Sequence, residues 1–288
     1  MISLKDKVIL DALFQNWKQE FMQLKTLEEH VNATEEMARM AFYYTARWMK
    51  KVYAPQKSPG ESLSCHTPLF FHGLGFPVKD EWNKIGICRR ILDAAEQFAD
   101  LAPEEFEAAM WEATGKDIGA RAAEIYPRSR GMITPAGWNC GSLKYDPPTP
   151  DKPKQISLHI YNTVSPHSFF EYPDYLISCF LLVMREAELR YGADTLFCSS
   201  WLNDHLRWLE YFPAEWQENL SPRNFDRLTG MTVGDWGAIY DARGCLKAKY
   251  VAMVRESGKL PFCPRRSHCS FEAMRAHLAE LAKEEGAK

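Results

Sequence analysis

The sequence has no long hydrophobic run and no block of charge of a single sign. Apolar residues never continue for the roughly 18 positions that a membrane-spanning helix requires, so we expect no transmembrane segment. Lys, Arg, Asp and Glu are scattered along the chain and give a net charge of −3. A basic cluster for nucleic acid and an acidic tail for a basic partner are both missing. We therefore expect neither a nucleic-acid partner nor a membrane partner.

Targeting and cysteine patterns indicate a reducing compartment. The chain starts with MISLKDKVILDAL, which lacks the charged stretch and the sustained apolar stretch of a secretory signal. Eight cysteines are spread over 288 residues, a length that can bury a full core without disulfide staples. We predict a cytoplasmic protein whose cysteines are reduced thiols.

Motifs that identify a particular chemistry are missing as well. No serine lies in a Gly-x-Ser-x-Gly elbow, so the sequence does not favour a nucleophilic serine. No two histidines have His-x-His or His-x-x-x-His spacing, and the CPRRSHC segment at 263–269 matches no common zinc pattern. The sequence therefore leaves the question of a bound metal open.

Aromatic residues, in contrast, are abundant. They make up 13% of the chain and include nine tryptophans. Aromatic side chains bury large areas and often line pockets, so this content mildly favours a ligand cavity, although a Trp-rich core is the more frequent explanation.

The first half of the chain has helical spacing of apolar residues. It predicts two helices over residues 3–53, with Asn32 or Thr34 as the N-cap of the second. Further helices are expected at 80–100, 103–113 and 117–126, and the aromatic segment 64–77 reads as a loop. Residues 127–153 are rich in proline, and we place a domain boundary there, near residue 130. The prediction is an all-helical domain over 1–128.

The second half, 129–288, alternates strands and helices. Strands are expected at 155–162, 195–202 and 231–241, and an extended segment at 138–145. Helices are expected at 174–191, 204–211 and 243–257, and a last one from an N-cap at Ser270 through 285, after a loop at 260–269. Strands separated by helices imply a mixed or largely parallel sheet with covering helices. The predicted fold class is therefore α+β or α/β.

Candidate site residues gather where the strands at 155–162 and 195–202 end. They are His159, Asn162, His167, Ser200, Trp201, Asn203 and His205, and Asp235 and Tyr240 of the third strand are expected to face the same cleft. Ligands collect at the carboxyl ends of strands in open α/β sheets. His159, His205 and Tyr240 are the catalytic candidates, because imidazole and phenol transfer protons. Asn162, His167, Ser200, Trp201, Asn203 and Asp235 are the substrate-binding candidates.

Structural roles compete with these assignments. His159 fits a hydrogen-bonded core histidine as well as a cleft wall, and residues 165–168 fit a tight turn. Asn203 followed by Asp204 is also a good helix N-cap.

Two short segments carry a resemblance to a known family. Leu158, His159 and Ile160 form one, and the other comprises Cys198, Ser200, Trp201, Leu202, Asp204 and Leu206. Together with the order of elements they resemble two-domain members of the GCN5-related N-acetyltransferase (GNAT) superfamily, in which a helical domain precedes a GNAT-like domain. The resemblance implies a mixed sheet whose strands at 156–161 and 195–201 part to hold the pantetheine arm of an acyl-CoA.

The sequence departs from that family in one place. The glycine-rich turn that binds pyrophosphate at a helix N-terminus is missing, because residues 162–173 (NTVSPHSFFEYP) contain no glycine. The leading hypothesis is an acyl-CoA-dependent N- or O-acyltransferase acting on a small molecule. The alternatives are a CoA-independent enzyme, such as a metal-dependent hydrolase, lyase or oxygenase using the histidines, and a non-enzymatic ligand-binding protein. The sequence leaves the oligomeric state open.

Overall fold

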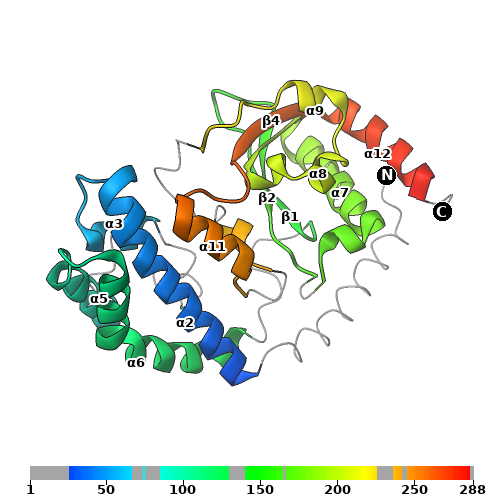
Figure 1. The fold of residues 1–288 in the computed structure, drawn as a ribbon. Coiled ribbons are helices and arrows are strands. Elements are labelled where there is room, and N and C mark those ends of the chain that lie inside the picture. Colours follow the sequence, from blue (N-terminus) through cyan, green and yellow to red (C-terminus); the bar gives the residue numbers. More distant parts are fainter. Residues whose placement is uncertain are drawn as a thin grey trace. The chain divides into compact units, whose positions relative to one another are not determined.

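A computed structural model of the chain describes most of its residues (Figure 1). The described residues are 26–66, 74, 85–129, 140–164, 167–225, 236–241 and 245–285. They divide into two compact units. The sheet unit comprises the described residues from 140 to 223 and from 262 to 285. The helical unit comprises 26–129 and the described residues from 224 to 261.

One division between the units, at 130/131, falls where the sequence analysis expected a domain boundary. The described residues between 224 and 261 group with the helical residues, although consecutive domains over 1–128 and 129–288 would place them with the sheet.

The helical unit begins with α2 (Leu27–Tyr44), which continues as the π-helix η1 (Thr45–Tyr53). The N-cap of α2 is Thr26, so the predicted caps Asn32 and Thr34 are wrong. Thr26 and Glu29 form a capping box, in which each backbone N–H donates to the other residue's side chain, over 2.8 and 3.1 Å. This reciprocal pair satisfies two of the donors that a helix start leaves open, which explains why the helix starts before Asn32.

Three more helices complete the first part of this unit. They are α3 (Pro59–His66), α5 (Gly86–Gln97) and α6 (Pro103–Ser129). Two separate helices were expected within 103–126, whereas α6 is continuous through Gly115. A Cβ at Gly115 would lie 2.7 Å from the Trp111 ring, so glycine provides space for this ring on the helix. Buried apolar side chains of α2, α5 and α6, including Phe42, Ile91 and Met110, form one core.

The predicted strand at 231–241 is wrong over the residues that the structure describes, which form a helical turn. Residues 231–235 lie outside the described residues, and the 3₁₀ helix η6 (Gly237–Ile239) follows Trp236. Trp236 and Ile239 are three positions apart and both buried, so a helical turn points them to the same side, which a strand cannot do. There they pack with Tyr44, at 5.4 Å between the Tyr44 and Trp236 rings. Helix α11 (Ala248–Ser257) follows.

The sheet unit contains one four-stranded mixed sheet in the order β1-β2-β3-β4. Its strands are β1 (Leu143–Asp146), β2 (Gln155–Ile160), β3 (Thr195–Ser200) and β4 (Arg265–Ser270). β2 and β3 are parallel, and the two outer pairs are antiparallel. A mixed sheet was predicted, but β4 was expected to be a loop.

Helices α7 (Pro173–Tyr191) and α12 (Phe271–Glu285) pack against one face of this sheet (Figure 1). Ser270 accepts the Ala273 N–H at 3.2 Å, so the predicted cap at the start of α12 is confirmed. Alternating strand residues such as Ile156, Leu158 and Leu196 point into this core.

Short helical segments follow β3. In place of one helix at 204–211, the chain forms the 3₁₀ helix η4 (Trp201–Asp204) and then α8 (Leu206–Leu209). Helix α9 (Ala214–Glu218) comes next. A further 3₁₀ turn, η3 (Phe169–Glu171), precedes α7. Trp208 and Trp216 are fully buried, so part of the tryptophan content builds the core. Within the described residues, no helix has the length and apolar character that a membrane crossing requires.

Candidate functional site

The sheet splits between its two middle strands. β2 and β3 pair over three positions, Gln155–Thr195 to Ser157–Phe197, and this register stops there in the described structure. The outer ladders continue, because β2 stays paired with β1 to Ile160 and β3 stays paired with β4 to Ser200. The carboxyl-terminal halves of β2 and β3 are therefore held by different neighbours and are not paired with each other.

A thiol contacts the backbone where the two strands part. Cys198 Sγ donates to the Leu158 carbonyl oxygen at 3.6 Å, and both residues are buried. Burial raises the pKa of the Cys198 thiol to about 12. The side chain is therefore protonated at neutral pH, which excludes it as a thiolate nucleophile.

His159 lies on the face of β2 opposite the core. Its Nε2 is 2.6 Å from Oδ2 of Asp146 on β1, and its side chain is 46% exposed. The β1–β2 register sets Asp146 beside Ser157 and Lys144 beside His159, so the imidazole and the carboxylate are diagonal neighbours on one face. A carboxylate at this distance orients an imidazole and favours one tautomer, which leaves Nδ1 to accept a proton.

Asp146 was missed by sequence reasoning. It lies in the segment LKYD, and only the pairing register of β1 with β2 brings it to His159. The exposure of His159 excludes a role as a histidine buried in the apolar core.

Asn162 and His167 form a turn after β2. Asn162 Nδ2 donates to the His167 carbonyl at 2.7 Å, and Asn162 Oδ1 accepts the Val164 N–H at 3.3 Å. His167 Nδ1 lies 3.5 Å from Glu171 Oε2. The Asn162 amide thus bonds to the backbone on both sides of residues 165 and 166, which lie outside the described residues, so the tight turn at 165–168 stays a prediction.

Residues after β3 also form local contacts. Ser200 Oγ accepts the Leu202 N–H at 3.1 Å and caps η4. Asn203 is fully buried. Its Nδ2 donates to the carbonyls of Cys198 and Arg265 at 3.1 and 2.9 Å, and its Oδ1 accepts the Trp208 Nε1–H at 3.1 Å. All three contacts lie within the protein, so Asn203 ties η4 to the strand ends.

Aromatic rings surround His205. Its ring stacks on Phe170 at 5.4 Å and lies 5.2 Å from Phe262, which also stacks on Trp201 at 5.5 Å. His205 and Trp201 are both partly buried. The structure therefore brings these two candidates together through a common aromatic neighbour.

Two candidates remain, Tyr240 and Asp235. Tyr240 belongs to the helical unit, where it forms an isolated bridge with Leu246 and packs beside Trp236 and Ile239, and burial raises the pKa of its phenol. The strand that was expected to carry Tyr240 into the cleft does not form at 236–239. Asp235 lies outside the described residues.

Three buried hydroxyls support the end of β2. Tyr175 OH of α7 lies 2.8 Å from Thr163 Oγ1 and 3.1 Å from Ser142 Oγ, and the two smaller hydroxyls are 2.9 Å apart. This hydroxyl triad joins the start of β1, the loop after β2 and helix α7. It holds the chain where β2 leaves the sheet, and no sequence motif predicted it.

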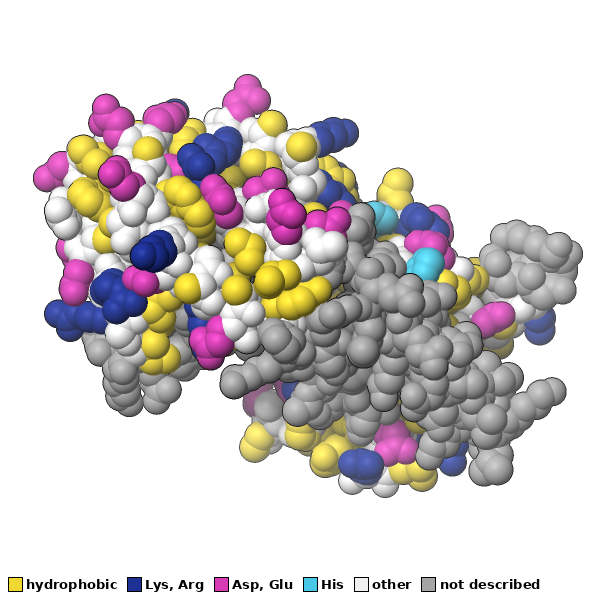
Figure 2. Space-filling model, turned by 90° about the horizontal axis from the view of Figure 1, so that it is seen from below, with side chains coloured by type: hydrophobic (Ala, Val, Ile, Leu, Met, Phe, Trp, Pro, Cys, Tyr) yellow, Lys and Arg dark blue, Asp and Glu magenta, His cyan; other side chains and the backbone are white. Residues whose placement is uncertain are grey.

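Metal-ligating side chains do not converge in the described part of the chain. No group of three or more His, Cys, Asp or Glu residues there has the arrangement to hold a metal ion. On the described surface that Figure 2 displays, acidic and basic side chains lie among one another.

Comparisons with known proteins identify no family for this chain. No family model matches the chain, and neither a curated protein nor a solved structure matches it.

Proposed function

We propose that this protein is a GNAT-like acyltransferase that transfers an acyl group from acyl-CoA to an amine or hydroxyl of a small molecule. One observation carries the proposal, namely the end of β2–β3 pairing after Ser157 and Phe197. Beyond these residues β2 and β3 are not paired with each other, and an extended chain with amide groups can pair with the edge of a strand as an added strand does. The pantetheine arm of CoA has this chemistry, and its thioester supplies the acyl group.

His159 is the proposed general base. Its imidazole is accessible and is oriented by Asp146 at 2.6 Å. In the reaction the acceptor nitrogen or oxygen forms a bond to the thioester carbonyl carbon, and the C–S bond breaks so that CoA leaves as its thiolate, which takes up the proton when the imidazolium returns it. The acceptor proton goes to Nδ1 of His159, while Nε2–H keeps its bond to the Asp146 carboxylate.

The first turn of the helix after β2 opposes the binding of the donor's phosphates. α7 has Pro173 at its first turn, which removes one backbone N–H donor. Asp174 lies in the same turn and Glu171 precedes it, so two carboxylates stand where a helix N-terminus would otherwise attract a pyrophosphate. We therefore derive no phosphate contact at this helix.

The other predicted residues have supporting roles in this proposal. Trp201 and His205 form an aromatic wall with Phe262 at the end of β3. Asn162, Ser200 and Asn203 hold the turns on which the wall and His159 depend.

Binding of acetyl-CoA to the full-length chain tests the proposal. A ligand at about one hundred times its Kd stabilises the folded protein by about 2.7 kcal/mol, so we expect Tm to rise by several degrees. CoA without the acyl group is the matched control for the thioester. If neither compound changes Tm and no acyl-CoA is consumed with amine or alcohol acceptors, the proposal is wrong.

A second candidate function rests on the misfit at α7. His159 and Asp146 can also activate water, which would make the protein a CoA-independent hydrolase. An ester or amide hydrolysed at equal rates with and without CoA, and no longer hydrolysed by the His159→Ala variant, would favour this function over acyl transfer.

A further inference from the structure

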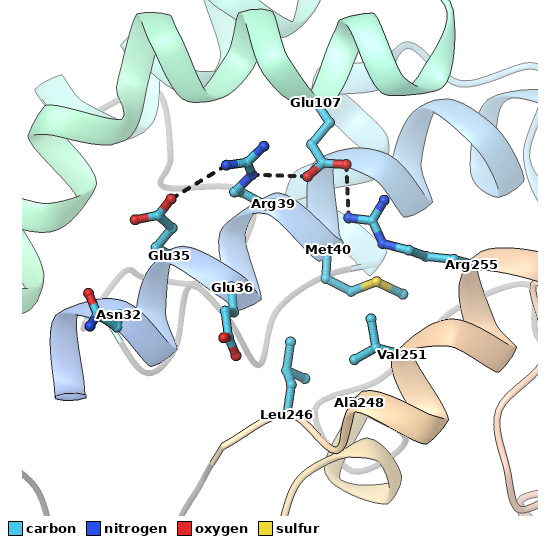
Figure 3. Close-up of a pocket in the computed structure, with 10 residues that line it drawn as sticks. All are labelled: Asn32, Glu35, Glu36, Arg39, Met40, Glu107, Leu246, Ala248, Val251 and Arg255. Carbon is cyan, nitrogen blue, oxygen red and sulfur yellow. Dashed lines mark hydrogen bonds and ion pairs between the residues drawn. The ribbon is translucent and has the colours of Figure 1, made fainter.

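The helical unit contains a hollow of about 600 Å³ that no candidate residue of the sequence analysis lines. It lies between α2 and α11, with Glu107 of α6 at one end (Figure 3). Small-molecule sites typically have volumes of about 300–1,000 Å³, so the hollow has the size of a ligand site.

Positive and negative charges balance at the end of the hollow where Glu107 lies. Arg39 Nη1 lies 3.5 Å from Glu35 Oε1, and Arg39 Nε donates to Glu107 Oε1 at 3.0 Å. Arg255 Nη2 lies 2.8 Å from Glu107 Oε2, and its guanidinium also covers the Tyr43 ring at 4.3 Å. Two cations therefore face two carboxylates, and this end holds no excess positive charge for an anionic ligand.

Glu36 adds one negative charge that this chain of ion pairs does not use. It is exposed on α2 and points into the space beside Leu246, away from Arg39 (Figure 3). Among the described residues, no ion pair involves Glu36. The net charge of the lining is therefore −1, and Glu36 carries it.

The wall beside Glu36 is apolar. Met40 is buried, and its side chain lies beside Val251 with Leu246 next to them (Figure 3). Thioether and aliphatic groups of this kind pack well against an aromatic or aliphatic ligand body. The hollow thus combines a carboxylate with an apolar wall.

We propose that this hollow is a binding site for an organic cation, an amine attached to an apolar body. The ammonium group pairs with Glu36, and the apolar body lies against Met40, Leu246 and Val251. The inference does not depend on the proposed acyl transfer, because every residue that carries it belongs to the helical unit.

Three ligands of one shape test the charge preference. 4-Phenylbutylamine, 4-phenylbutanol and 4-phenylbutanoate are titrated into the full-length chain by calorimetry up to about 10 mM. We expect the amine to bind about fivefold more tightly than the alcohol, and the carboxylate to bind most weakly. Equal or tighter binding of the carboxylate overturns the proposal, and so does the absence of amine binding.

Substitutions at two exposed positions, Glu36 and Ala248, test where the ligand binds without disturbing the core. Glu36→Gln should weaken amine binding about three- to fivefold and leave alcohol binding unchanged. Glu28→Gln, a charge change on the same helix away from the hollow, should change neither. Ala248→Trp should fill the hollow and abolish binding of all three ligands. Amine binding that survives both Glu36→Gln and Ala248→Trp would place the amine elsewhere and overturn the assignment.

Discussion

Cys198 and Leu158 face each other where β2 and β3 part, with the thiol of one donating to the carbonyl of the other at 3.6 Å. Both side chains belong to the apolar core of the sheet unit. A thiol is a weak donor, so this contact gives the Leu158 carbonyl a partner where the two strands are no longer paired. The split is therefore compatible with a packed core.

The burial of thiols predicts a loss of stability in alkali. Burial raises the pKa of Cys88 to about 11, and the pKa values of Cys140, Cys179, Cys198 and Cys269 to about 12. Folding favours the protonated form of each thiol. The thiols therefore make their full contribution to the free energy of unfolding below the unfolded pKa of about 9, and this contribution is lost as pH rises toward 11–12. Each thiol then removes up to roughly 1.4 kcal/mol per pH unit from the free energy of unfolding.

Urea denaturation between pH 7 and pH 11 measures this loss of stability, and the loss should begin near pH 9. Cys198→Ala should flatten the alkaline decline, because one buried thiol no longer resists ionisation. Cys245→Ala should leave the decline unchanged, since Cys245 is only partly buried. An equal decline in all three proteins would contradict the explanation.

His159 and Asp146 make a second prediction, on turnover. His159→Ala should lower kcat at least about a hundredfold in whichever reaction the protein catalyses, the usual contribution of a positioned base. Asp146→Asn should cause a smaller loss, because the imidazole remains but its tautomer is no longer favoured.

The pH–rate profile separates catalysis from structure in these variants. A base must be neutral to accept a proton, so the wild type should lose activity on the acid side, and His159→Ala should lack this limb. His268→Ala is the matched control, because His268 is exposed on β4, an outer strand of the same sheet that is not paired with β2. A residual rate in His159→Ala equal to that of His268→Ala would remove His159 from the mechanism.

The hydroxyl triad predicts a specific effect on stability. Tyr175→Phe removes the phenol that contacts both Ser142 and Thr163 and leaves two buried hydroxyls with one partner fewer. We expect the free energy of unfolding to fall by about 1–3 kcal/mol. Tyr191→Phe, on the exposed end of α7, should change it by less than about 0.5 kcal/mol. Chemical denaturation compares the two, and equal values would show that the triad is not stabilising.

Much of the sheet unit was predictable because its patterns are local. The strands at 155–162 and 195–202 and the helix at 174–191 were predicted near β2, β3 and α7, since each has a clear period in the sequence. β4 was missed, because RRSHCS shows only Ser267 and Cys269 to the core, and neither has the bulk that identifies a strand. Segment 215–221 covers its outer edge through bonds such as Ser221 N–H to the Arg266 carbonyl, which the sequence cannot reveal.

Of the candidate site, the sequence predicted strand positions and not side-chain surroundings. His159 was predicted on a strand, which β2 confirms, but the sequence left open whether it faces a cleft or the core, and its partner Asp146 depends on the register between two strands. Asn203 illustrates the opposite case, because a buried amide with three internal bonds and a substrate-binding amide have the same sequence signal. The sequence also gives no indication of the hollow beside Glu36, whose lining comes from three helices far apart in the chain and from Leu246.

The N-terminus of α7 yields the last prediction, on the donor. Because Pro173, Asp174 and Glu171 oppose phosphate binding there, acetyl-CoA and S-acetylpantetheine should have kcat/KM values within about threefold of each other. Asp174→Asn removes one carboxylate from the first turn and should raise kcat/KM for acetyl-CoA while leaving that for S-acetylpantetheine unchanged. Initial rates with both donors and both proteins give the comparison. A loss of about a hundredfold or more on removing the nucleotide would mean that the phosphates are bound by residues other than this helix, and the donor specificity argued from α7 would be wrong.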